Sequence, residues 1–135
     1  MKTDKRVAAL AACVLLFPAR WTAAHHSTAA EFDPNKPVTF TGKVEKVMWT
    51  NPHIYTYVSV KQEGGADMVY HIEGSAPNTL FRNGWRRDSL HPGDTVTVSG
   101  WRSKNPESHN VGQATITIAE GRKVFSGNGP LKVAE

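Results

Sequence analysis

The sequence predicts an all-β protein with one short helix, folded as a small OB-like Greek-key β-barrel; an open β-sandwich is the alternative. Three observations predict this fold class. Short stretches alternate apolar and polar residues with the period of two that half-buried strands show. Turn-forming Gly, Pro, Asn and Asp separate these stretches. One helical pattern follows the third stretch, and this order within about 90 residues matches an OB barrel.

The first predicted strand covers residues 38–49, VTFTGKVEKVMW, and its alternation slips after Val44, which indicates a bulge or bend. Residues 50–53 form a turn, because Asn-Pro favours turns and Pro52 cannot continue a central ladder. A hairpin loop is predicted at 63–67. The remaining strands are predicted at 54–60, 68–73, 95–101, 113–119 and 122–127.

The pattern changes to a short helix at residues 75–84. Ser75 is a candidate N-cap, Pro77 fits the first turn, and Gly84 ends the pattern. Glycines at 42 and 100 lie in predicted strands and suit the sharp coiling that a small barrel needs.

Residues 1–24 are predicted to be a cleavable signal peptide. A basic start precedes an apolar run at 7–17, which has the length of a signal h-region and is too short to span a bilayer. Small residues stand at the −3 and −1 positions of a site that would be cut after Ala24, so that His25 becomes the first residue. Lipidation at Cys13 and an uncleaved anchor are the alternatives. We therefore expect a periplasmic or secreted bacterial protein.

The rest of the chain divides into an extended segment at 25–37, the barrel at 38–126 and a flexible tail at 127–135. Loss of the leader lowers the formal net charge from +4 to +1, because the leader carries four basic residues and one acidic residue. A nucleic-acid partner then has no electrostatic support. The single cysteine leaves with the leader, so the mature chain has neither a disulfide nor a thiolate ligand. We predict no transmembrane segment in the mature chain.

Three motifs are distinctive together: His25-His26-Ser27, then Trp-Thr-Asn-Pro-His at 49–53, then Gly-Trp-x-Arg-x-Ser-Leu-x-Pro-Gly-Asp at 84–94. With them the chain resembles, over about residues 25 to 126, an uncharacterised group of exported bacterial proteins, the domain-of-unknown-function family numbered 6152. His71 departs from the pattern, since such proteins tend to carry an aromatic or other large residue there. The resemblance implies export and a small β fold, and it implies no activity.

A copper site is one hypothesis for function. An N-terminal His25 would offer its amine and its ring nitrogen to Cu(II), and the imidazole of His53 would complete a tetragonal nitrogen set. His26 is a further candidate donor. In the competing interpretation, the adjacent histidines are merely solvated and His53 caps its turn through a backbone hydrogen bond.

A recognition patch is the other hypothesis. Aromatic rings next to arginine guanidinium groups are suited to the recognition of carboxylate or phosphate groups. In the competing interpretation, Trp85 fills one end of the barrel and the arginines pair with Asp88 and Glu73. The candidate ligand- or partner-binding residues are Trp49, Asn51, Trp85, Arg86 and Arg87.

Catalysis has little support, because no serine lies in a nucleophile elbow and no pair of carboxylates can be placed in one cleft. We therefore expect a protein that is not an enzyme. The first expectation is a periplasmic binding or accessory module for a small molecule or an envelope protein. The alternative is a copper-binding or copper-handling protein that uses His25 with His53.

Overall fold

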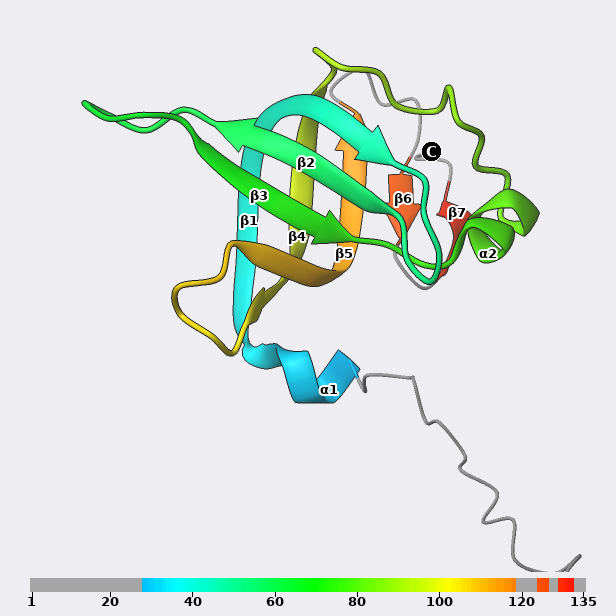
Figure 1. The fold of residues 1–135 in the computed structure, drawn as a ribbon, viewed down its shortest axis with the longest axis horizontal. Coiled ribbons are helices and arrows are strands. Elements are labelled where there is room, and N and C mark those ends of the chain that lie inside the picture. The colour runs from blue at the N-terminus through cyan, green and yellow to red at the C-terminus, as the bar shows by residue number, and fades with distance from the viewer. Residues whose placement is uncertain (1–27, 119–123, 127–128, 133–135) are drawn as a thin grey trace, which may run out of the picture.

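The computed structural model describes residues 28–118, 124–126 and 129–132 (Figure 1). It consists mostly of strands, with a short helix before the first strand and another between the third and fourth. The elements are α1 (Thr28–Glu31), β1 (Phe32–Met48), β2 (Tyr55–Val60), β3 (Met68–Glu73), α2 (Pro77–Arg82), β4 (Thr95–Ser103), β5 (Asn110–Ile118), β6 (Val124–Ser126) and β7 (Gly129–Lys132).

Five of the strands close into a ring. β1 pairs with β2 on one edge and with β4 on the other, β2 pairs with β3, and β4 pairs with β5, all antiparallel. A parallel pairing of β3 with β5 closes the ring, with His71 opposite Asn110 and Ile72 opposite Val111. This ring of mixed strands, with α2 between β3 and β4, confirms the OB-like fold class.

β1 is long because it pairs with two neighbouring strands, mainly over different parts of its length. Its first part pairs with β4, and its last residues, from Lys43 on, pair with β2. The register shifts between Val44 and Lys46, as the slip in alternation predicts. Such a bulge lets a single strand turn from one side of a barrel to the other.

The structure differs from the prediction at both ends of the domain. Residues 25–37 were expected to form an extended segment, but α1 lies within this range, and residues 32–37, which are extended, belong to β1. Ala29 and Ala30 favour a helix, and Pro37 is tolerated in β1 because only one edge of the strand is paired there. The tail expected at 127–135 contains β7, which pairs with β6.

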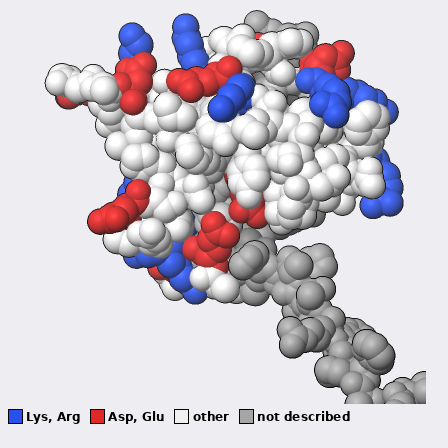
Figure 2. All heavy atoms as spheres, in the orientation of Figure 1, with Lys and Arg blue, Asp and Glu red and all other residues white. Residues whose placement is uncertain are grey.

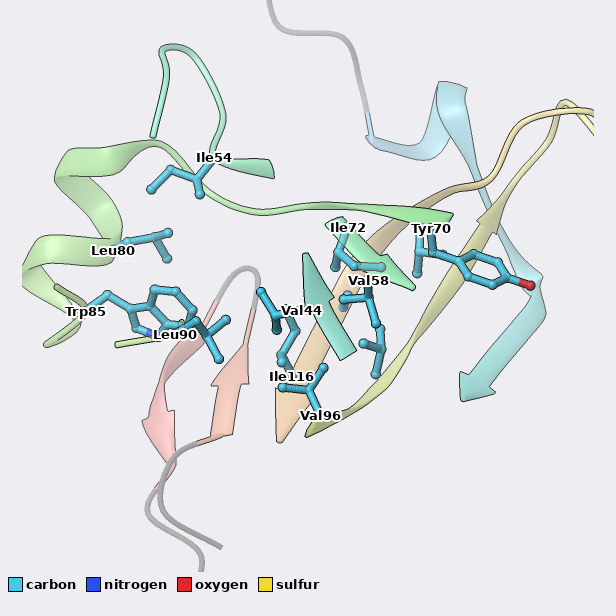
Figure 3. Packing of buried hydrophobic residues seen from close by; sticks show 13 residues of the cluster. Val44, Ile54, Val58, Tyr70, Ile72, Leu80, Trp85, Leu90, Val96 and Ile116 are labelled. Atoms are coloured by element: carbon cyan, nitrogen blue, oxygen red, sulfur yellow. The ribbon is translucent and has the colours of Figure 1, made fainter. Parts of the chain in front are cut away.

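The core fills the ring and extends out of it under α2. Val58, Val96 and Val98 are fully buried inside the ring. Figure 3 shows Leu80 and Trp85, from α2 and the segment after it, packed at one end of this core. The buried hydrophobic residues are Phe32, Val44, Ile54, Val58, Tyr70, Ile72, Leu80, Trp85, Leu90, Val96, Val98, Val111, Ala114 and Ile116.

Acidic and basic side chains are interspersed over the face in Figure 2, in keeping with the small net charge expected after loss of the leader. Within the described ranges, no helix is long and apolar enough to cross a membrane.

Candidate functional site

The β1–β2 connection and α2 meet at one end of the barrel. Trp49, which follows β1, lies with its ring centroid 6.1 Å from that of Phe81 in an edge-on contact, and 6.4 Å from that of Trp85. We call the cluster of Trp49, Phe81, Trp85, Arg86 and Arg87 the aromatic–arginine end. It unites two of the three sequence motifs, which are separated by about 30 residues of chain and two strands.

The local sequence explains why α2 presents one ring outward and turns another inward. Leu80 is buried against the core, so the next helical position, Phe81, faces solvent and is 47% exposed. Gly84 adopts a left-handed φ of 90°, which ends the helix. The chain then reverses, the Trp85 amide donates to the Leu80 carbonyl at 2.9 Å, and the Trp85 ring enters the core with 3% exposure.

The capping residue of α2 is not the one expected. Ser75 was the candidate N-cap, but the helix begins at Pro77 and Ala76 occupies the N-cap position without a side-chain hydrogen bond. Pro77 itself favours this start, because its fixed φ suits the first helical turn and its missing N–H needs no partner there.

The two adjacent arginines have different environments. Nη1 of Arg86 donates to the carbonyl of Phe81 at 3.0 Å and to that of Trp85 at 2.7 Å, so this side chain holds the end of α2 together. The Arg87 guanidinium instead lies 5.5 Å from the centroid of the Trp49 ring. Within the part of the chain that the structure describes, no carboxylate forms an ion pair with either arginine.

Trp49 is half-buried, and its indole N–H is shielded from solvent without a hydrogen-bond acceptor among the described residues. Its position is therefore stabilised by ring packing and by the Arg87 cation rather than by a hydrogen bond. Asn51 is exposed in the same connection, where its backbone carbonyl accepts from the hydroxyl of Thr50 at 3.2 Å. The peptide bond between Asn51 and Pro52 is cis.

His53 lies at the edge of this end, next to the segment that leaves β3. Its Nδ1 is 3.0 Å from the Gly74 carbonyl and 3.4 Å from a carboxylate oxygen of Glu73. A carbonyl can only accept, so Nδ1 carries the proton of this hydrogen bond and the neutral ring keeps its lone pair on Nε2. The side chain is 41% exposed, and a histidine oriented in this way is arranged as metal ligands commonly are.

The other two candidate metal ligands, His25 and His26, lie outside the described residues. Among those that are described, no group of three or more His, Cys, Asp or Glu side chains could hold a metal ion. The remaining histidines are dispersed: His91 is exposed in a turn next to Asp94, and the ring of His109 lies 5.9 Å from that of Tyr70.

The helix that follows His25 and His26 is tied to the connection between β4 and β5. The Nζ atom of Lys104 donates to the carbonyl of Ala29 at 2.6 Å, and the Lys104 amide donates to that of Glu31 at 2.9 Å. Glu31 also affects Tyr55 of β2: burial first, then the negative charges of Glu73 and Glu31, raise the pKa of this phenol. The end of α1 therefore lies within electrostatic reach of Tyr55, which begins β2 two residues after His53.

Sequence reasoning missed two features. Phe81 was not among the candidate binding residues. The outer face of β2 was not considered, although Tyr57 there contacts His71 at 4.6 Å between centroids and Lys46 lies 4.3 Å from the Tyr57 ring. Alternation in residues 54–60 could have placed Tyr55 and Tyr57 outward, but their neighbours depend on the register between strands.

A closed five-strand ring with aromatic rings and arginines gathered at one end defines a small OB-like β-barrel protein. The chain belongs to DUF6152, a family of unknown function whose model matches residues 14–113. This match confirms the family to which the motifs point, over a range that begins within the predicted leader and ends in β5. No curated protein and no solved structure matches the chain significantly.

Proposed function

We propose that the protein is an exported binding or accessory module that holds a partner molecule through its aromatic–arginine end. The observation that carries this proposal is the exposure of Phe81 beside two arginines and a half-buried tryptophan. An exposed ring that lies against another aromatic ring and arginine side chains matches the composition of binding interfaces, where aromatic residues and Arg are enriched. Export rests on the predicted leader.

The support for this end is its rigidity as well as its composition. Leu80 and Trp85 anchor α2 in the core, and Arg86 closes the end of the helix, so Phe81 and Arg87 are held on an ordered surface. A preorganised surface loses little conformational entropy when a partner binds. The ring of strands supports this surface, and Phe81 and Arg87 would contact the partner.

A photo-crosslinking amino acid placed at position 81 tests the proposal in the cells that make the protein. We expect a covalent adduct of defined mass when the probe replaces Phe81. The matched control carries the same probe at Arg102, which is exposed in β4 at the opposite end of the barrel. If both positions give the same adducts, or position 81 gives none, the module does not use this end.

Copper handling is the second candidate, and two observations favour it. The hydrogen bond from His53 to Gly74 leaves Nε2 available on an exposed ring, and the bonds of Lys104 hold α1 three residues after His25. Three residues span at most about 10 Å. The amine and imidazole of an N-terminal His25 would then supply two nitrogen donors and His53 a third, a set that suits Cu(II).

The copper proposal is tested on protein purified from its native compartment, whose intact mass first establishes whether the chain starts at His25. Cu(II) affinity is then compared among this protein, a variant with one extra residue before His25, and His53→Ala. We expect both changes to weaken binding at least about tenfold, because each removes a nitrogen ligand. Unchanged affinity in the variant with the extra residue rules out a chelate made by the terminal amine.

A further inference from the structure

We infer that the partner presents a carboxylate-bearing polypeptide segment, of which an acidic side chain binds Arg87 while an apolar side chain covers Phe81. This inference rests on the proposed function and names the chemistry of the partner. It is carried by the charge at this end of the barrel, by the different roles of Arg86 and Arg87, and by the exposed ring of Phe81.

Among the described residues, the largely exposed segment 81–88 carries a net positive charge. Residues 81–88 contain Arg82, Arg86 and Arg87 against one acid, Asp88, and all four are exposed. Within the described chain, none of these four residues takes part in an ion pair: the pairs join Lys36 with Asp33, His53 with Glu73 at the edge of this end, and His91 with Asp94. A surface of this kind attracts an acidic partner and repels a basic one.

Arg87 is the residue that the fold leaves available for a ligand. Arg86 has its guanidinium committed to two backbone carbonyls. Among the described residues, the guanidinium of Arg87 contacts the Trp49 ring and makes no hydrogen bond, so its N–H groups can donate to a ligand. An arginine stacked on an aromatic ring is partly preorganised, and its planar fork matches both oxygens of a carboxylate.

The occupant is a polypeptide rather than a free anion or a lipid surface. Phe81 is 47% exposed, and its ring lies under the Arg86 guanidinium, so apolar and cationic contacts are offered together on an open surface. Every basic residue of the segment 81–88 is an arginine, whereas attraction to anionic lipid needs only positive charge and is served equally well by lysine.

The test uses a fluorescent peptide of alternating Glu and Phe, with the same peptide carrying Gln in place of Glu as its uncharged match. We expect the Glu peptide to bind at least about tenfold more tightly than the Gln peptide, and to weaken as salt rises from about 50 to about 500 mM. Arg87→Ala should weaken binding at least about tenfold, and Arg87→Lys should recover only part of the loss because it lacks the fork. Arg102→Ala is the matched control and should bind as the parent protein does.

Three results would overturn the inference: equal binding of the two peptides, equal losses in Arg87→Ala and Arg102→Ala, or binding to phosphatidylglycerol vesicles without binding to the Glu peptide. Thermal unfolding of Arg87→Ala shows whether a loss of binding is merely a loss of fold. The crosslinking experiment keeps the two proposals apart. An adduct at position 81 together with equal binding of the two peptides would leave the module intact and refute the acidic partner.

Discussion

At the scale of single residues, Arg86 and Arg87 show how neighbouring identical side chains acquire different roles. Both follow Trp85, and both are exposed. Only Arg86 can reach back to the carbonyls at the end of α2, because the chain reverses at Gly84. Arg87 points to the other side of the segment, where Trp49 lies. We therefore assign Arg86 to stability and Arg87 to binding.

Replacing Arg86 and Arg87 in turn should separate these roles. Arg86→Ala should lower the free energy of unfolding by about 1 kcal/mol, because two hydrogen bonds to the helix end are lost. Arg87→Ala should change it by less than about 0.5 kcal/mol, since this exposed residue makes no hydrogen bond in the described chain. Urea unfolding of both variants measures the difference. Equal losses would return Arg87 to a structural role.

Tyr55 provides a second prediction at this scale, through its raised pKa. Burial and the charges of Glu73 and Glu31 favour the neutral phenol in the folded state, so the folded protein keeps this proton above the ordinary pKa of 10.0. The stabilisation is present below pH 10.0 and is lost as the pH rises through the folded pKa. The free energy of unfolding of the parent protein should therefore fall more steeply above this pH than that of Tyr55→Phe. Urea unfolding at a series of alkaline pH values checks it, and parallel curves would contradict it.

At the scale of elements, the barrel depends on places where two strands or a strand and a ring come close together. The Phe32 ring of β1 lies directly on the backbone of Gly112 in β5, with no room for a Cβ atom. In the same region the register between β4 and β5 shifts between Ser99 and Trp101, and Gln113 takes a left-handed φ of 49°. This bulge turns β5 as it crosses from β3 to the outer hairpin of β6 and β7.

Gly112→Ala should consequently lower stability by about 1 to 3 kcal/mol, because the added methyl group forces the buried Phe32 ring or the strand to shift. Gly65→Ala is its matched control: this glycine lies in the β2–β3 loop with nothing near the position of a Cβ atom. The control should change stability by less than about 0.5 kcal/mol. Thermal or urea unfolding measures the stability of both variants. A loss of stability in Gly65→Ala as large as in Gly112→Ala would show that the close approach of Phe32 to Gly112 is not the cause.

At the scale of the whole molecule, the core is continuous from the interior of the ring to the aromatic–arginine end. Trp85 belongs to the same buried cluster as Val58 and Ile116, although it lies outside the strands. The end that we assign to binding therefore shares its hydrophobic core with the barrel. A substitution that weakens the core at this end should destabilise every strand.

Trp85→Ala should therefore destabilise the whole barrel, by about 3 to 5 kcal/mol, because it leaves a large cavity in a shared core. The far-UV circular dichroism and the fluorescence of the remaining tryptophans should report one transition at the same, lowered urea concentration. Two separate transitions would show instead that the α2 end unfolds on its own.

The local sequence located the central elements, missed those at the two ends of the domain, and was insufficient for the site. Alternation and turn residues located β1 to β5, the bulge after Val44 and the helix at 77–82, because these depend on burial of one strand face and on short-range sterics. The motifs were sufficient for the family. They did not distinguish Arg86 from Arg87, since both arginines have the same chemistry and nearly the same position in the chain.

The sequence by itself determined an all-β chain with a predicted leader, a short helix after the third strand, and aromatic and basic residues concentrated in two motifs. Only the tertiary structure decided that Trp49 meets Phe81 and Arg87, and that His53 donates to Gly74. The reason is physical. Periodicity indicates which side of a strand is buried. Contacts between distant segments depend instead on strand register and on closure of the ring, and both are determined by all five strands together.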